Sequence, residues 1–235
     1  KYSKAAVEFV ASRTTLIGKQ PQIELLNVQT PIPARAASVV GKDAVKSYHQ
    51  TEADRALKSS LAAVKKAGLE VKSGYVLGDP AEAIAKRAER NDSDLIVMGS
   101  HGHGALLQLM VGSVTNGVLA HTRKPVLMVR DRAAPKSDSL RVGIAVDGSK
   151  FGRAAVRYVL DHIDLFGAAP SISVIHAVPD FAGVVMPDMA GLALPQYSDE
   201  DIKAMQRNAF VAAVGPLHKL FAKAGKRFEE VCLSG

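Results

Sequence analysis

Three glycines directly after a short apolar run could bring backbone N–H groups close to an anion. Residues 95–98 read Leu-Ile-Val-Met, and Gly99, Gly102 and Gly104 follow them. An uninterrupted apolar run is typical of a parallel strand that is covered on both faces. Because glycine carries no side chain, a phosphate can approach the backbone of such a turn closely. The pattern therefore predicts a phosphate site at the carboxyl end of a parallel strand.

The start of a helix completes this pattern. Gly112 and Ser113 follow Gly102 after nine intervening residues. Serine is a good helix N-cap, so we expect Ser113 to cap a helix over residues 114–121, whose positive end favours an anion. The segment contains no Gly-Lys-Ser or Gly-Lys-Thr, and its first glycine gap does not fit the dinucleotide pattern. Neither of the two common phosphate-loop classes therefore describes it.

This glycine spacing resembles the nucleotide-binding signature of the universal stress protein family. The resemblance extends over the apolar run beforehand and over residues 120–129, which read Ala-His-Thr-Arg-Lys-Pro-Val-Leu-Met-Val. It implies a protein that binds ATP, or ADP or AMP, with or without Mg²⁺. The binding residues that the resemblance implies are Val28, Met98, Gly99, His101, Gly102, His103, Gly112, Ser113, Val114 and Asp147.

The resemblance also implies a role for single residues of this set. The phosphates contact Gly102, Gly112 and Ser113. Val28 lines the adenine pocket, and Asp147 lies near the base or ribose of a second copy. His103 takes the place where many relatives carry a basic residue, so a protonated imidazole there would favour phosphate. Core packing for Val28 and a turn for Asp147 are the alternatives.

The chain repeats itself. Residues 1–10 match residues 150–159 at an offset of 149, and residues 66–68 match residues 223–225 at an offset of 157. We expect two tandem copies of one α/β unit, with eight extra residues inside the second copy. The expected domains are residues 1–132, which lack a first strand, and residues 140–235, which lack a C-terminal part, with a linker over residues 133–139.

Helical and strand patterns alternate along the chain. The resemblance and this order imply an α/β fold with a doubly wound, five-stranded parallel sheet, like that of the adenine-nucleotide α-hydrolases, in two tandem copies. The expected helices are 2–16, 42–67, 80–90, 114–121, 150–163 and 199–224. The expected strands are 23–28, 70–76, 94–98, 125–129, 141–146, 171–177 and 227–233, with loops from residue 30 and over 179–198.

Composition limits the partners. The net charge of the chain is +7. Hydrophobic residues make up 47% of it, but no apolar run reaches the ~20 residues that span a membrane. We therefore expect no membrane partner. The basic residues are dispersed and aromatic residues make up only 5%, so nucleic-acid binding is not expected. The single cysteine, Cys232, fits a cytoplasmic protein.

No catalytic set is visible in the sequence. His101 and His103 lack further ligands at usable spacing, so we expect no metal site held by the protein. These observations favour binding over turnover, and the resemblance then implies an ATP-binding stress-response protein that acts as a nucleotide-dependent switch or protector. Two alternatives stay open: a slow ATPase or nucleotidyl-transfer enzyme of the same fold, and a scaffold whose nucleotide site is vestigial.

The apolar strand over residues 125–129 predicts an assembly. It is the last strand of the first copy, so it lies at a sheet edge where another strand can pair. In the family, this strand pairs with its counterpart from a second domain. We expect either a pseudo-dimer of the two copies within one chain or a homodimer.

Overall fold

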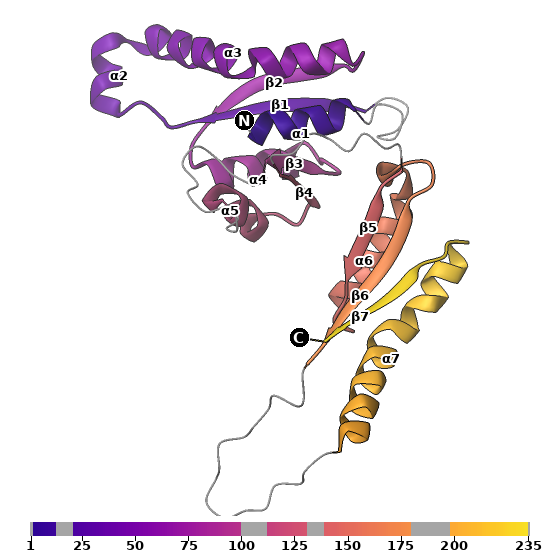
Figure 1. The fold of residues 1–235 in the computed structure, drawn as a ribbon. Coiled ribbons are helices and arrows are strands. Elements are labelled where there is room, and N and C mark those ends of the chain that lie inside the picture. Colours follow the sequence, from indigo (N-terminus) through magenta and orange to yellow (C-terminus); the bar gives the residue numbers. More distant parts are fainter. Residues whose placement is uncertain (1, 13–20, 100–111, 131–138, 180–197, 235) are drawn as a thin grey trace, which may run out of the picture. The chain divides into compact units, whose positions relative to one another are not determined.

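The computed structural model describes residues 2–12, 21–99, 112–130, 139–179 and 198–234. The chain divides into two compact units, residues 1–136 (unit 1) and residues 137–235 (unit 2). Figure 1 shows both as alternating helices and strands. Each unit is described by itself below.

Unit 1 contains two pairs of parallel strands. β1 pairs with β2 and β3 pairs with β4, and no ladder joins the two pairs within the described residues. Helix α1 packs against α3, and α4 packs against α5. The elements are α1 (Tyr2–Ala11), β1 (Ile23–Gln29), α2 (Ala34–Val40), α3 (Lys42–Lys66), β2 (Val71–Leu77), α4 (Pro80–Arg90), β3 (Ile96–Gly99), α5 (Ser113–His121) and β4 (Val126–Val129).

Helix α4 begins at the capping residues that the sequence contains. The side chain of Asp79 accepts hydrogen bonds from the N–H groups of Ala81 and Glu82, and Pro80 takes the first helical position. Ala81 and other small apolar residues on one face are buried. The boundaries of this helix are those that the sequence predicts.

An ion pair connects α4 to β1. Nε and Nη2 of Arg87 donate to Oε1 of Glu24 at 3.0 and 2.6 Å, and Asn91 donates to Oε2 at 2.6 Å. Both charged side chains are largely buried, and paired guanidinium and carboxylate groups form strong, directional hydrogen bonds. This contact links the strand pair β1–β2 to the helix that packs on α5.

Unit 2 contains one parallel sheet of three strands in the order β5, β6, β7. Its core lies between this sheet and helices α6 and α7, and includes Val156, Val174, Leu217 and Phe221. The elements are β5 (Arg141–Ala145), α6 (Lys150–Asp161), a 3₁₀ turn η1 (Ile163–Phe166), β6 (Ser171–Val178), α7 (Asp199–Lys223) and β7 (Glu229–Ser234).

The two units pair corresponding residues in the same register. Asn27 in β1 pairs with Tyr75 in β2, and His176 in β6 pairs with Cys232 in β7. The second pair lies 149 and 157 positions beyond the first, which are the offsets of the sequence repeat. Helices α3 and α7 both have 25 residues and are also 157 positions apart. Residues 30–41 precede α3 and residues 179–198 precede α7, so the eight extra residues lie there.

The alternating, parallel α/β architecture is confirmed, and several details differ: the helix expected over residues 2–16 ends at Ala11, and the strand expected over residues 94–98 begins at Ile96. Helix α2 lies where the sequence predicts a loop; it is short and buries no residue, so no apolar periodicity marks it. The predicted helix 150–163 ends at Asp161, before η1. The described strands form two pairs and one triple rather than five-stranded sheets, since no described strand lies between the two pairs of unit 1.

Candidate functional site

The described part of the glycine signature is the end of β3 and the beginning of α5. In β3, Met98 and Gly99 pair with Met128 and Val129 of β4. Met98 is half-buried and packs on the small core of unit 1, so core packing accounts for at least part of its role. Gly99 is the last residue of the strand, where the sequence places the beginning of the loop.

The beginning of α5 corrects one prediction. Ser113 is the first helical residue and not the cap, because Gly112 adopts the extended conformation of an N-cap (φ −61°, ψ 150°). Within the described residues, no side chain caps this helix, whereas Asp79 caps α4 and Ser149 caps α6. The first N–H groups of a helix need an acceptor from outside it. Without a side-chain cap, the N-terminus of α5 suits an anion.

Packing and one hydrogen bond hold α5 in place. Val118 is fully buried, and Val114 packs on the same core. Thr115 is also buried, and its hydroxyl donates to the carbonyl of Gly99 at 3.4 Å. The structure therefore brings Gly99 next to the first turn of the helix that Ser113 begins.

Val28 lies near the end of β1, in the other strand pair of unit 1. It is half-buried and pairs with Val76 in β2. Among the described residues, no hydrogen bond or core contact joins it directly to the glycine signature, and its role in the adenine pocket stays a prediction.

A buried histidine beside the end of β1 was not identified from the sequence. The side-chain nitrogen of Gln29 donates to the carbonyl of His49 and to Asn27, at 2.9 and 2.8 Å. Its oxygen therefore accepts from Nδ1 of His49 at 2.6 Å. These bonds fasten α3 to β1. Within the described residues, Nε2 is buried without a hydrogen-bond partner.

Asp147 of unit 2 lies two residues after the end of β5. Its side chain is exposed, and the N–H of Ser149 donates to Oδ1 at 2.9 Å. Hydrogen bonds from Ser149 lower the pKa of Asp147 below the ordinary value, and the bond from the Ser149 side chain has a larger effect than the one from its backbone. The carboxylate therefore remains a charged acceptor at the carboxyl end of a strand.

Close by, Nδ1 of His176 lies 2.7 Å from the carbonyl of Val146, which requires Nδ1 to donate. The imidazole thus approaches the end of β5, and its charge contributes in a minor way to the low pKa of Asp147.

Three predicted binding residues, His101, Gly102 and His103, lie outside the described residues. Among the residues that the structure does describe, no group of three or more His, Cys, Asp or Glu side chains could hold a metal ion. Over the same residues, no helix is long and apolar enough to cross a membrane.

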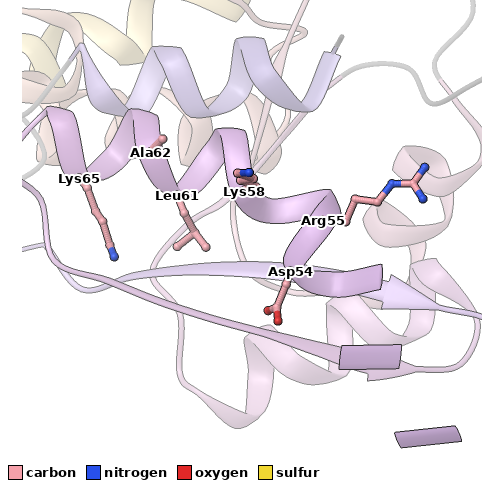
Figure 2. A pocket seen from close by; sticks show the side chains of 6 residues that line it. All are labelled: Asp54, Arg55, Lys58, Leu61, Ala62 and Lys65. Atoms are coloured by element: carbon pink, nitrogen blue, oxygen red, sulfur yellow. The ribbon is translucent and has the colours of Figure 1, made fainter. Parts of the chain in front are cut away.

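A surface hollow on α3 is separate from this signature. Figure 2 shows the side chains that line it, all from this one helix. No residue of β1, β3 or α5 contributes to it. Its lining is mostly charged and consists of Asp54, Arg55, Lys58, Leu61, Ala62 and Lys65.

Comparison with known proteins identifies the family. The model of the universal stress protein family matches residues 1–130, so the chain belongs to that family. Universal stress protein MJ0577 of Methanocaldococcus jannaschii is 46% identical over 63 residues, which cover 27% of this chain and 39% of that protein. Universal stress protein Mb2028c of Mycobacterium bovis is 26% identical over 133 residues, 56% of this chain and 44% of the relative. The chain thus spans less than half of the length of either relative.

A solved structure supports the fold over the whole chain. The crystal structure of a universal stress protein from Archaeoglobus fulgidus has a TM-score of 0.65 and is 20% identical. The match covers 100% of this chain and 75% of that one. Because it extends beyond residue 130, the universal stress protein fold includes both units.

Proposed function

We propose that unit 1 binds an adenine nucleotide whose phosphates lie between the end of β3 and the beginning of α5. The observation that carries this proposal is the N-terminus of α5, which begins at the Gly-Ser of the glycine signature and has no side-chain cap among the residues that the structure describes. An uncapped helix N-terminus offers N–H groups and partial positive charge to a phosphate. Met98 and Gly99 would lie beside the base and ribose, and Val28 would line the adenine pocket. His101, Gly102, His103, Ser113 and Val114 complete the proposed set.

ATP, ADP and AMP are the ligands to test first, with and without Mg²⁺. Other universal stress proteins have been solved in complex with cAMP, dAMP and AMP. We infer that nucleotide binding makes this protein a switch or protector in the stress response of the cytoplasm. Turnover of ATP is the alternative, and steady-state release of phosphate would reveal it.

We also propose that the chain is a tandem of two universal stress protein domains, residues 1–132 and 140–235. The equal registers of β1–β2 and β6–β7 support this organisation. In the second domain, Asp147 would face the base or ribose of a nucleotide.

The proposal is tested by identifying what the protein binds. Mass spectrometry of the small molecule released on denaturation is expected to find an adenine nucleotide, and calorimetry measures its affinity. We expect Gly112→Val to weaken ATP binding by about tenfold or more, which corresponds to about 1.4 kcal/mol, because a branched side chain obstructs the helix N-terminus.

Gly74→Val is the matched control. Gly74 lies in β2, where an added Cβ would meet nothing within 4 Å, so ATP affinity should not change. A folded Gly112→Val protein that binds ATP as tightly as the wild type would refute the proposed phosphate site.

A further inference from the structure

Thr115 connects the two ends of the glycine loop. Its hydroxyl donates to the carbonyl of Gly99, the last residue of β3, and Thr115 itself lies in the first turn of α5. A helical threonine commonly bonds to a carbonyl one turn earlier in its own helix. Here the acceptor lies 16 residues earlier in the chain, on the strand before the loop. The side chain is only 2% exposed, so water does not readily replace this bond.

The opposite side of α5 is fixed by close packing on α4. A Cβ atom added to Gly117 would lie 2.5 Å from Cβ of Ala81. The two helices are therefore so close at this point that only glycine fits there. Val118, fully buried, packs into the same small core. These contacts hold the body of α5, and Val114 packs on the same core from its first turn. The bond from Thr115 acts at the first turn, whose N–H groups have no acceptor within the helix.

We propose that Thr115 is a positioning residue for the phosphate site, because it sets the first turn of α5 against the end of β3. This inference rests on the proposed function of unit 1. Because this bond already orders the two ends of the loop, phosphate binding does not have to supply the free energy of ordering them. Thr115 acts through the N–H groups of α5 and through Gly99, and the structure shows no need for it to touch the nucleotide.

The expected effect is selective for phosphate. At 3.4 Å the hydrogen bond is longer than the usual ~2.7–2.8 Å between oxygens, so its contribution is modest. We expect Thr115→Val to weaken ATP binding by about three- to tenfold, as the loss of one hydrogen bond does. Binding of adenosine, which has no phosphate, should be unchanged. Thr115→Ser keeps the hydroxyl and should restore most of the affinity for ATP.

Calorimetry of the 235-residue chain with ATP and with adenosine tests this. Val118→Ala is the matched control: it loosens the core beside Thr115 and keeps the hydroxyl, so the ratio of ATP to adenosine affinity should stay that of the wild type. Amide hydrogen exchange over residues 113–117 should be faster in Thr115→Val than in Thr115→Ser.

Two outcomes would overturn the inference. One is a folded Thr115→Val protein with the affinity for ATP of the wild type. The other is an equal loss for ATP and adenosine, which would mark Thr115 as a purely structural residue. A wild-type protein that binds no adenine nucleotide would instead refute the proposed function itself.

Discussion

Asp147 is a residue whose charge is maintained by one neighbour. The side chain of Ser149 has the largest part in lowering the pKa of Asp147, its backbone N–H also donates to the carboxylate, and the same residue caps α6. The lowered pKa means that ionised Asp147 is favoured in the folded protein. A group whose pKa is lower in the folded than in the unfolded chain stabilises the fold above the unfolded value and loses that contribution as the pH falls.

We therefore expect Ser149→Ala to raise the pKa of Asp147 toward its ordinary value of 3.8. Carboxyl NMR titration measures this directly. The stability of unit 2 should then depend less steeply on pH below about pH 4, because less of the lowered pKa remains to be lost. Asp161, at the opposite end of α6 from Ser149, serves as the internal reference. A pKa of Asp147 that is unchanged in Ser149→Ala would contradict this account.

Sequence reasoning identified some residues of the candidate site better than others. Gly99 ends β3 and Gly112 is the N-cap of α5. Both positions were predictable because the spacing of glycines follows the conformations that the backbone must adopt. The predicted N-cap, Ser113, is one position too late, since Gly112 adopts the extended conformation of the cap. The bonds of Thr115 and His49 could not be predicted, because their partners lie 16 and 20 positions away and only the fold brings them together.

At the scale of elements, the distance between α4 and α5 is decided by Gly117. The absence of a side chain there lets α5 approach Ala81 in the first turn of α4. Strand and helix order was predictable from apolar runs and caps, as for α4 with Asp79 and Pro80. Helix α2 was not predictable, because it buries nothing and so carries no amphipathic pattern.

We expect Gly117→Ala to destabilise unit 1 by about 1–3 kcal/mol, since the new methyl group overlaps Ala81 and forces the helices apart. Denaturant unfolding followed by circular dichroism measures the change. The same substitution at Gly74, where the added Cβ meets no atom within 4 Å, should be neutral or slightly stabilising. Equal stability of Gly117→Ala and wild type would show that α5 is free to move away from α4.

At the scale of the whole molecule, β4 offers an unpaired edge. One edge pairs with β3, and along the other no partner strand lies within the described residues. Three of its four residues are half-buried, and Met128 is 40% exposed. Exposed edges of apolar strands are places where further strands add. How domains or chains use this edge is not encoded in local patterns, so the pairing stays a prediction.

Replacing both Leu127 and Val129 with lysine should separate the domains or chains that pair through β4, because two buried charges cannot be accommodated at a strand interface. Small-angle scattering would show a more extended particle if the pairing lies within one chain. Light scattering would show half the mass if it joins two chains. Leu77→Lys, at an exposed leucine that ends β2, is the control. An unchanged profile and mass would exclude β4 as the pairing edge.

The connections before α3 and α7 differ in length, and the strands and helices on either side of them tolerate that difference. Residues 30–41 and 179–198 connect helices of the same length to strands in the same register, although one connection is eight residues longer. Each doubling of a flexible loop costs only about 0.6 kcal/mol in closure entropy, so loop length in general is weakly constrained. An insertion before α3, of the length by which the second connection is longer, should therefore leave the strand register of unit 1 unchanged. Gly41, exposed and at φ +86°, marks the place in unit 1.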